Sequence, residues 1–585
     1  MATTSDIRGG LCIHYNNDIY KVVEFLHVKP GKGPAFVRTK LKSVTTGKVI
    51  DNTFSAGHKI DDVRVETHSF QFLYADGDTY HFMNQNDYNQ IELQKSALDN
   101  PHLLKEGQLV TVLINSETSE PLSVDMPAHV ILEVASTEPG VKAHSQHIEE
   151  ADVLFAREIF DYSFSKSSIY KRLEHISSRI GSRLSGSLGA GLALEYAKSQ
   201  LDSLDLDRVW LQPVQVRKWV RGLRAYAYVK TEKGETTALP VCALIGSIAT
   251  PSLGINAEVV EVRNFKDLKE EWWSNVQGKI VFYNHPMNPN QVDTFKAYLE
   301  LEDIYRLGVQ KAADYGAVGV IIRSATLKID DIPHTGFISY GKLPENKYIP
   351  VVAISTKGAN FLSSLLVLNP KLKFYFRQNC KNLGYVNTHN VIGEITGSAY
   401  PNKVIVVSGH LDSSDLGGGA HDNATGSVQS LGVLEIFKKL NYRPRHTIRL
   451  VLYMGEQNGM SGAKAYERFE NRDSHIFVLE NSSGGFAPRG FTFECTQVQF
   501  EKLALFRHLF EPYLSDKFIK ANLNGGISFL RGKKTILAGL RTDSQRYFDL
   551  YHSERDIFKN VNKREFELGQ GAMALLVYLV DKYQN

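Results

Sequence analysis

Five side chains suited to metal-dependent hydrolysis follow one another along the last third of the chain. His410 and Asp412 end the apolar run "KVIVVSGHLD", and Asp422 follows the Gly-rich bend "DLGGGAH". Glu456 ends a second apolar run, "TIRLVLYMGE", and His552 lies in "YHSERD". Metal-assisted hydrolysis needs imidazoles and carboxylates as ligands, and a general base for the bound water. Their order at successive predicted strand ends therefore indicates one shared metal site.

Each of these residues also has an ordinary explanation when taken alone. A single His is usually a core or surface residue, and an Asp after glycines is usually a turn former. A Glu at a strand end is usually solvated. Asp412, two residues after His410, is placed to orient that imidazole. The joint order of the five favours a common site over coincidence.

The elements that must position these side chains change in type along the chain. Up to about residue 135, short alternating runs such as "DIYKVVEFLHV" and "GQLVTVLI" predict β-strands and small barrels. The stretch at 135–160 passes from a Pro-Gly turn to a charged helical pattern, so we place a domain boundary there. Beyond it, apolar strands such as "SHIFVLEN" alternate with helices, which predicts a mostly parallel α/β sheet with its chemistry at the carboxyl strand ends.

Composition sets broad limits on the protein. A chain of 585 residues predicts three or more domains, and a net charge of +3 does not by itself indicate nucleic-acid binding. The four cysteines are far apart, which argues against a disulfide scaffold. The N-terminus lacks the apolar core of a signal peptide, and "AMALLVYLV" is too short to cross a bilayer. We therefore expect a cytoplasmic protein without a membrane partner.

A second candidate site lies in the loop "HVKPGKGPAFVRTKLK" at residues 27–42. Gly31 and Gly33 belong to a tight exposed turn with Lys32 near its tip and Lys29 beside it. The ordinary interpretation is a solvated hairpin with surface lysines. The functional interpretation is a basic finger that enters a phosphate-rich cavity.

Residues 1 to about 142 resemble bacterial elongation factor P, on the loop above and on "TGKVIDNTFSAGHKI", "LYADGDTYHFMNQNDYNQIEL" and "VILEVASTEPGVK". The resemblance implies an SH3-like (KOW-like) domain at 1–65 and an OB-type domain at 66–134. It also implies that Lys32 reaches toward the peptidyl-transferase centre, with the ribosome and peptidyl-tRNA as partners, and is commonly modified. Only the first strand of the family's third domain, around "PAHVILEVAS", is present, so 135–160 is expected to be a truncated remnant and linker.

Residues 160–585 resemble co-catalytic zinc aminopeptidases, most closely dipeptidases of the carboxypeptidase Q type. Motifs that carry the resemblance include "RIGSRLSGS", "ALIGSIATPSLGI", "GYVNTHNVIGEITGS", "VVSGHLDSSDLGGGAHDNATG" and "YFDLYHSERD". The resemblance implies a peptidase domain in two parts, 161–237 and 383–585, interrupted by a protease-associated insert at 238–382. It further implies short peptides as substrates, two zinc ions that share an Asp and a water, and a homodimer.

The residue-by-residue match to that zinc site is incomplete. His410 matches the first ligand, Asp422 the bridging ligand, His552 the last ligand and Glu456 the catalytic base. Gln457 stands where the family has a Glu ligand, and Ser482 stands where it has an Asp ligand. Further departures are Gly526, where relatives tend to be acidic, and Tyr551, where many carry a His.

These replacements remove one anionic ligand from each metal. A neutral amide or hydroxyl is a far weaker zinc ligand than a carboxylate, so we expect no zinc or one, with His410, Asp422 and His552 as the set for one ion. Glu480 could substitute, but strand alternation is expected to point it away. Three hypotheses stay open: a translation module fused to an impaired peptidase domain, an active zinc dipeptidase or aminopeptidase with an accessory module, and a non-functional fusion produced by gene decay.

Overall fold

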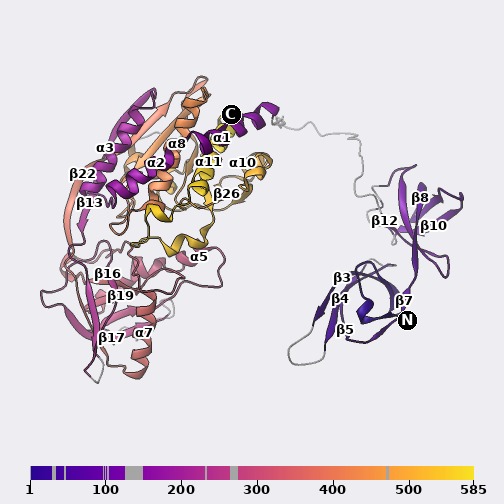
Figure 1. Cartoon of the computed structure of the whole chain (residues 1–585), viewed down its shortest axis with the longest axis horizontal. Coiled ribbons are helices and arrows are strands. Elements are labelled where there is room, and N and C mark those ends of the chain that lie inside the picture. Colours follow the sequence, from indigo (N-terminus) through magenta and orange to yellow (C-terminus); the bar gives the residue numbers. More distant parts are fainter. Residues whose placement is uncertain are drawn as a thin grey trace. The chain divides into compact units, whose positions relative to one another are not determined.

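The computed structural model describes residues 2–28, 35–44, 48–95, 98, 101, 104–125, 149–230, 234–263, 275–469 and 474–584. They form two compact units, Met1–Ala143 and His144–Asn585 (Figure 1). The expected third-domain strand around residues 127–136 lies outside the described residues.

The first unit consists of two antiparallel five-stranded sheets, as the alternating runs predict. The first sheet has the order β5 (Val49–Ser55), β4 (Phe36–Ser43), β3 (Asp18–Val28), β2 (Cys12–Tyr15), β7 (Asp62–Val63). The second has the order β10 (Gln90–Gln94), β9 (Thr79–Asn84), β8 (Val65–Asp76), β11 (Leu109–Asn115), β12 (Pro121–Asp125). This unit also contains a short antiparallel pair of strands, β1 (Ala2–Thr3) and β6 (Lys59–Ile60). Separate apolar clusters, one around Leu41 and one around Phe82, give each sheet its own core.

The second unit contains a mixed eight-stranded sheet. Its order is β13 (Arg208–Val220), β22 (Lys381–Ile395), β24 (His446–Tyr453), β23 (Tyr400–His410), β25 (His475–Glu480), β28 (Ile536–Thr542), β26 (Pro488–Glu494), β27 (Lys517–Lys520). The four central strands β24, β23, β25 and β28 are parallel, whereas β13, β22 and β26 pair antiparallel with their neighbours toward the centre. The parallel centre is the part that the sequence pattern predicts.

Helices cover both faces of this sheet, which explains why its central strands are apolar without alternation. In β23, Val404–Val407 are all buried. One face packs against α1 (Glu150–Ser165), α3 (Leu188–Asp202), α8 (Thr425–Lys439) and α11 (Lys563–Tyr583). The other packs against α9 (Ser461–Phe469) and the 3₁₀-helix η12 (Gly526–Leu530). The short helix α10 (Gln497–Ala504) leads from β26 toward β27.

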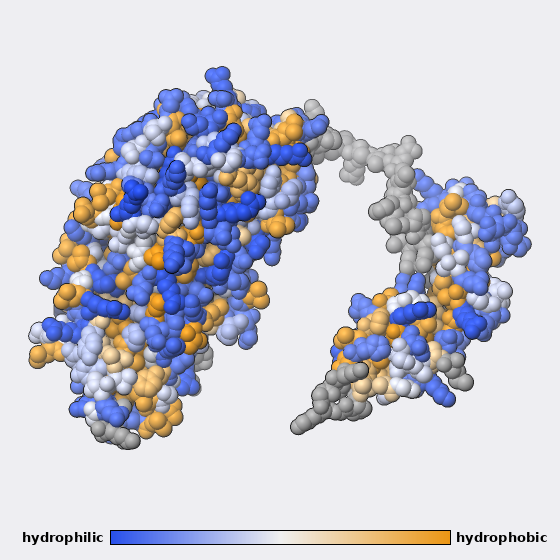
Figure 2. Space-filling view, in the orientation of Figure 1, coloured by the Kyte–Doolittle hydropathy of each residue, from blue (hydrophilic) through white to orange (hydrophobic). Residues whose placement is uncertain are grey.

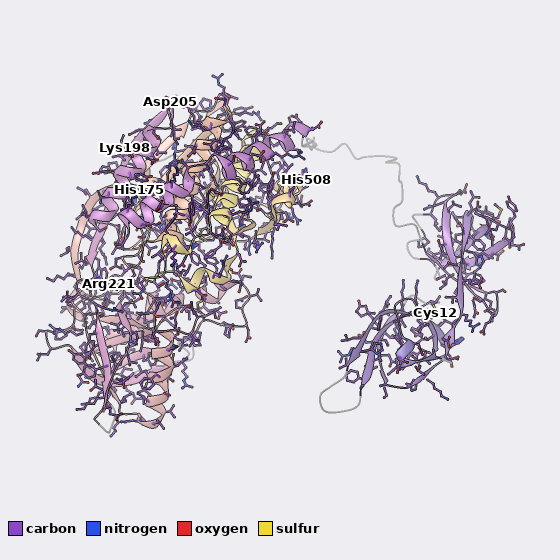
Figure 3. The ribbon with its side chains drawn as sticks, viewed as in Figure 1. Cys12, His175, Lys198, Asp205, Arg221 and His508 are labelled. Atoms are coloured by element: carbon purple, nitrogen blue, oxygen red, sulfur yellow. The ribbon has the colours of Figure 1, made fainter. Side chains whose placement is uncertain are left out.

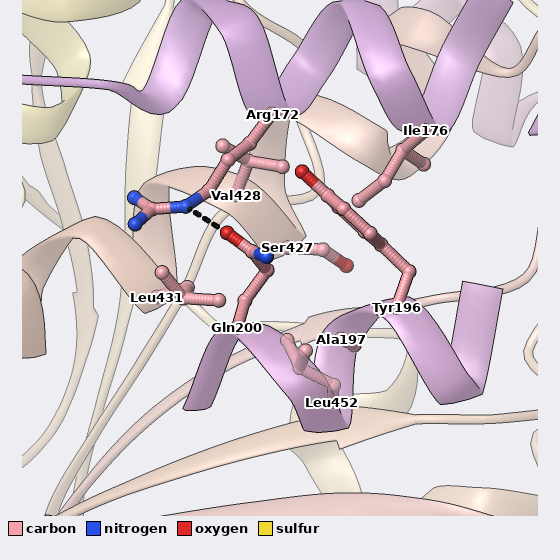
Figure 4. Close-up of a pocket in the computed structure, with 9 residues that line it drawn as sticks. All are labelled: Arg172, Ile176, Tyr196, Ala197, Gln200, Ser427, Val428, Leu431 and Leu452. Atoms are coloured by element: carbon pink, nitrogen blue, oxygen red, sulfur yellow. Dashed lines mark hydrogen bonds between the residues drawn. The ribbon is translucent and has the colours of Figure 1, made fainter. Parts of the chain in front are cut away.

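Polar contacts tie the helices on the first face together. Arg172 of α2 (Ile169–Glu174) donates a hydrogen bond of 2.8 Å to Gln200 of α3, beside a cavity of about 10 Å³ (Figure 4). The guanidinium of Arg172 also pairs with Glu435 of α8. A void of this size holds about one water, so the junction is closely packed.

A second eight-stranded sheet lies within the same unit. Its order is β15 (Thr236–Ala238), β14 (Tyr226–Lys230), β21 (Lys373–Arg377), β17 (Ile255–Val262), β18 (Ile280–Tyr283), β19 (Gly319–Arg323), β20 (Val351–Ile354), β16 (Val241–Ala243). The strands from β17 to β20 are parallel. Helices α5 (Thr294–Leu299), α6 (Val309–Asp314) and α7 (Thr356–Leu368) accompany it (Figure 1). The sheet takes in β14 and so begins before the expected insert boundary at 238.

Arg221, just after β13, joins the two sheets (Figure 3). Its guanidinium donates two hydrogen bonds to the carboxylate of Asp415, at 2.6 and 2.5 Å, and one to the hydroxyl of Thr335 at 3.2 Å. Asp415 belongs to the loop after β23, and Thr335 to the segment between β19 and β20. A half-buried bidentate pair of this kind fixes the orientation of the second sheet against the site-bearing loops.

The face of the molecule seen in Figure 2 is mostly hydrophilic, and its hydrophobic residues are scattered in small patches. No helix among the described residues has the length and apolar character needed to cross a bilayer.

Candidate functional site

The carboxyl ends of two neighbouring parallel strands bring the predicted site residues together. His410 is the last residue of β23, and Glu456 follows β24 by three residues. Asp422 lies in the short segment η8 (Ala420–Ala424), where its own backbone is not helical, and His552 follows the 3₁₀-helix η13 (Ser544–Asp549). All four side chains line one cavity of about 530 Å³. The prediction of a shared site at strand ends agrees with this geometry.

Asp422 occupies the centre of the site, between two imidazoles. Its Oδ1 lies 3.2 Å from Nε2 of His410, and its Oδ2 lies 3.0 Å from Nε2 of His552. Burial opposes the charged carboxylate, but contact with the two imidazoles outweighs it and lowers the pKa of Asp422 below its usual range. Burial also opposes the imidazolium form of His410, but contact with Asp422 raises the pKa of His410 to about 10.

Gln457 and Ser482, which stand where the resemblance implies carboxylate ligands, make hydrogen bonds of their own. Gln457 donates from Nε2 to Oδ2 of Asp422 at 2.7 Å, and its Oε1 is buried with no partner in the described part of the chain. Ser482 donates to Oε1 of Glu480 at 2.7 Å. Glu480, the last residue of β25, contacts Ser482 but is not among the residues that line the cavity.

Asp412 positions both His410 and the loop of Glu456, although its carboxylate does not hydrogen-bond to the imidazole of His410 as expected. The imidazole Nδ1 of His410 lies 3.0 Å from the main-chain oxygen of Asp412 and 3.8 Å from its carboxylate. The buried carboxylate instead accepts three main-chain N–H groups, from Gly455, Glu456 and Gln457, at 3.0, 3.0 and 3.1 Å. Asp412 thus fixes the loop that presents Glu456 as well as the ring of His410.

Glu456 faces the same cavity in a setting that disfavours its charge. Burial is the main cause, and the neighbouring carboxylates of Glu480, Asp412 and Asp422 add to it, so that the pKa of Glu456 rises to about 8. The imidazolium of His410 acts in the opposite direction.

Two buried residues hold the loop between His410 and Asp422. Asp556 accepts the main-chain N–H groups of His421 and Asp422 at 2.6 and 3.0 Å. Arg183, fully buried, donates to the main-chain oxygens of five residues: Ile176, Gly181, Leu411, Gly418 and Gly419. Arg183 was missing from the predicted site, although the motif "RIGSRLSGS" contains it. No local pattern distinguishes an arginine that binds carbonyls from one on the surface.

The second sheet braces the loop that carries His552. The main-chain N–H of Thr335 donates to the carbonyl of His552 at 2.8 Å, and Nδ1 of His334 lies 2.8 Å from the carbonyl of Tyr551. Tyr551 stacks on the imidazole of His552, with ring centres 3.6 Å apart. His552 itself has a left-handed backbone, φ 56°, an uncommon conformation for a non-glycine residue that these contacts support.

Two separate parts of the second unit line the cavity. One side is the site described above together with Met460, Lys464, Tyr547 and Phe548. The other comes from the segment 295–339 and comprises Phe295, Tyr298, Glu302, Tyr305, Arg306, Phe337 and Ser339. Sequence reasoning missed this second side, because nothing in the order of residues places that segment over the strand ends of the first sheet.

At the centre of the site two imidazoles meet opposite oxygens of one carboxylate, with the amide of Gln457 bonded to the same carboxylate and the hydroxyl of Ser482 bonded to Glu480. Within the described parts of the chain, no group of three or more His, Cys, Asp or Glu side chains forms a ready-made metal site. The loop residues Lys29, Gly31, Lys32 and Gly33 lie outside the described residues.

Comparison with known proteins separates the chain into two parts. The elongation factor P KOW-like domain matches residues 3–60, and the elongation factor P OB domain matches 65–124. Peptidase family M28 matches residues 390–577. Elongation factor P of Christiangramia forsetii is 73% identical over 145 residues, 25% of this chain and 77% of that protein. Carboxypeptidase Q of Xenopus laevis is 34% identical over 394 residues, 66% of this chain and 80% of that protein.

The chain belongs to both the elongation factor P and the carboxypeptidase Q families. It joins an elongation factor P-like module, with its KOW-like and OB domains, to a carboxypeptidase Q-like M28 peptidase domain. The resemblances predicted from the quoted motifs are thereby confirmed.

Solved structures agree with the assignment of the second part. The M28 peptidase precursor from Shewanella amazonensis aligns with a TM-score of 0.70 and 26% identity, covering 74% of this chain and 98% of that one. A zinc aminopeptidase from Bacillus subtilis aligns with a TM-score of 0.53 and 17% identity, covering 71% and 95%. The second likeness concerns the fold alone.

Proposed function

We propose that the chain is an elongation factor P-like translation module carrying an M28 domain that binds short peptides but has an impaired two-zinc centre. The supporting observation is the hydrogen bond from the Gln457 amide to Asp422. In the proposed assignment His410, Asp422 and His552 are the remaining ligand positions, Glu456 is the base, and Asp412 positions His410 and Glu456.

The physical argument concerns charge. Each zinc position keeps one imidazole of its own and shares Asp422, while Gln457 and Ser482 supply no anion. Two dications held close together depend on carboxylates to offset their repulsion. The Nε2 of Gln457 is moreover a hydrogen donor directed at the carboxylate that both ions would share. These residues do not fit two zinc ions, and we expect none or one.

The first part of the proposal concerns translation. A module with these two domains is expected to bind the ribosome and peptidyl-tRNA through the loop that contains Lys32, and the cytoplasm is then its place of action. The boundaries 1–65 and 66–134, the linker at 135–160 and a protease-associated insert at 238–382 belong to the same proposal. A homodimer of the peptidase domain is also proposed from the family.

Metal content and turnover test the proposal together. The full chain is purified without chelator, zinc per chain is measured by mass spectrometry, and dipeptide hydrolysis is compared between wild type and Glu456→Gln. We expect at most about one zinc and no turnover that depends on Glu456. About two zinc ions per chain with base-dependent hydrolysis would contradict the impaired centre.

An active zinc-dependent dipeptidase or aminopeptidase is the second candidate. It is favoured by Glu456, a carboxylate that lines the cavity together with His410 and Asp422 and is placed to act as a general base. Zinc, when bound in such a site, lowers the pKa of its water. The same measurements decide between the two candidates.

A further inference from the structure

Arg323, in the second sheet, is a buried cation that no carboxylate neutralises. It is the last residue of β19 and is only 6% exposed. Burial lowers the pKa of Arg323, and no charged neighbour opposes this effect. It forms no ion pair with any residue that the structure describes. A buried charge without a partner is costly, so its presence here needs an explanation.

The other buried arginines of the described chain have anions beside them. Arg449 lies 2.9 Å from the carboxylate of Glu394. Carboxylates also lie near Arg183 and partly offset the lowering of its pKa by burial. Among the arginines buried in the described residues, Arg323 is thus the one without a neighbouring anion.

Only one of the three guanidinium nitrogens of Arg323 donates to a described residue. Nη1 donates to Oδ1 of Asn284 at 3.0 Å and to Oδ1 of Asn360 at 2.7 Å. Nε is buried without a partner, and Nη2, which is not fully buried, donates to no described residue. In Arg221 the same two nitrogens, Nε and Nη2, hold both oxygens of Asp415. The edge of a guanidinium that suits a two-oxygen anion is therefore the edge that Arg323 does not use within the described protein.

The two amides that contact Arg323 are oriented by it. A guanidinium only donates hydrogen bonds, so the oxygens of Asn284 and Asn360 face Arg323, and their Nδ2 groups donate elsewhere. Nδ2 of Asn284 donates to Oε1 of Glu261 at 2.6 Å. Nδ2 of Asn360 donates to no described residue, and Asn360 is exposed on α7. Arg323 and Asn360 thus offer two adjoining donors, Nη2 and Nδ2.

Glu261, which Asn284 connects to Arg323, already has its own partners. Its Oε1 accepts a hydrogen bond from Ser363 at 2.7 Å and lies 3.3 Å from Nε of Arg263. Burial raises the pKa of Glu261, but the hydrogen bonds that it accepts outweigh burial and lower that pKa. The charge of Glu261 is therefore matched by Arg263, and that of Arg323 is not matched.

The carboxyl ends of the parallel strands of the second sheet surround Arg323. Asn284 follows β18, and Asn360 lies on α7, which begins after β20. Open α/β sheets bind small ligands at such strand ends. Arg323, Asn284 and Asn360 do not line the cavity at Asp422, so this place is separate from the site described above.

We propose that Arg323 and Asn360 bind a small oxyanion, a phosphate or a carboxylate, at the carboxyl edge of the second sheet. The anion accepts hydrogen bonds from Nη2 of Arg323 and Nδ2 of Asn360, and it supplies the negative charge that the surroundings of Arg323 lack. The planar fork of an arginine matches the oxygens of both kinds of anion. Because Arg323 is 6% exposed, only a small ion or the end of a longer molecule reaches it.

Calorimetric titration of the full chain with sodium phosphate, and separately with sodium acetate, tests the proposal. Sodium chloride keeps the ionic strength constant. We expect saturable binding of at least one of the two anions, and the one that binds more tightly identifies the class of ligand. Arg323→Gln should weaken this binding at least about tenfold, because a charge-assisted hydrogen bond contributes roughly that factor.

Asn360→Asp gives a second test that does not depend on the folding of Arg323→Gln. Asn360 is exposed, and an Asp there places a carboxylate beside the guanidinium, so added anion should no longer bind. Ser364→Asp is the matched control, because it adds the same charge at an exposed position one turn further along α7. It should leave the affinity within about twofold, since solvent and salt screen a charge at that distance.

Three outcomes would overturn the site. They are no saturable binding of either anion, equal affinity of the wild type and a folded Arg323→Gln, and equal effects of Asn360→Asp and Ser364→Asp. Anion binding elsewhere on the chain would be recognised because it persists in Asn360→Asp. The titration involves neither zinc nor peptides, so its outcome is independent of the proposed function.

Discussion

The amide Nε2 of Gln457 lies 2.7 Å from Oδ2 of Asp422, the same oxygen that lies 3.0 Å from the imidazole of His552. A glutamate at position 457 could not make this contact as a donor, because an ionised carboxylate only accepts hydrogen bonds. Oδ2 of Asp422 thus accepts a hydrogen bond from the protein itself, whereas Oε1 of Gln457 and both ring nitrogens of His552 are buried without a hydrogen-bond partner among the described residues.

Restoring the two carboxylates should restore metal binding. In Gln457→Glu with Ser482→Asp, two anionic donors return to the positions now held by an amide and a hydroxyl, so we expect the zinc content to rise to about two ions per chain. Zinc per chain after dialysis against a weak chelator measures this. The single variants serve as controls, with at most about one ion each. An unchanged zinc content in the double variant would show that the deficit lies elsewhere.

Arg183 should be essential for the loop that carries Asp422. Arg183→Met removes the side-chain donor of five main-chain oxygens, of which only those of Ile176 and Gly419 are shown with a second, main-chain donor, so we expect the free energy of unfolding to fall by at least about 3 kcal/mol. Urea unfolding measures the change. The exposed Arg179, four residues earlier, gives the matched control Arg179→Met, which should cost less than about 0.5 kcal/mol. Equal effects of the two variants would refute the assigned role.

Asp152 should anchor the first helix of the second unit in a pH-dependent way. Its buried carboxylate accepts hydrogen bonds from Tyr578, Lys582 and Tyr583 of α11 at 2.5, 2.7 and 2.5 Å. Burial opposes its charge, but these partners prevail and lower the pKa of Asp152 below its ordinary value. We expect Asp152→Asn to cost about 3 kcal/mol at pH 7.

The sign of the pH dependence follows from that lowered pKa. A carboxylate with a depressed pKa in the folded state stabilises the protein above its unfolded pKa, about 4, and loses that contribution as the pH falls further. The difference in unfolding free energy between wild type and Asp152→Asn should therefore shrink below about pH 4. Asp161→Asn, at an exposed position of the same helix, is the control. A gap that stays constant down to pH 2 would rule out the ionic contribution.

Lys32 should carry the translation activity of the first unit. In the proposed role the side chain of Lys32 enters a phosphate-rich cavity. Lys32→Ala therefore removes a cation at the place where it contributes most to binding. We expect Lys32→Ala to weaken co-sedimentation with ribosomes. Lys59 is an exposed residue of the short strand β6, and Lys59→Ala should leave co-sedimentation unchanged. Equal binding of both variants would leave the resemblance without a ribosomal function.

The amino-acid sequence by itself determined the two family relationships, the β-rich first part, and the presence of Gln457 and Ser482 where the resemblance implies carboxylates. Motifs and strand patterns are local, because each lies within one short continuous stretch of the sequence. The tertiary structure decided which groups these residues contact: Gln457 with Asp422, Ser482 with Glu480, and the rings of α5 with those near His552. Such contacts join segments far apart in the chain: Thr294 and Ser544 are 250 residues apart, and Asp152 and Lys582 are 430 apart. Their geometry follows from how whole sheets and helices pack, which no local pattern records.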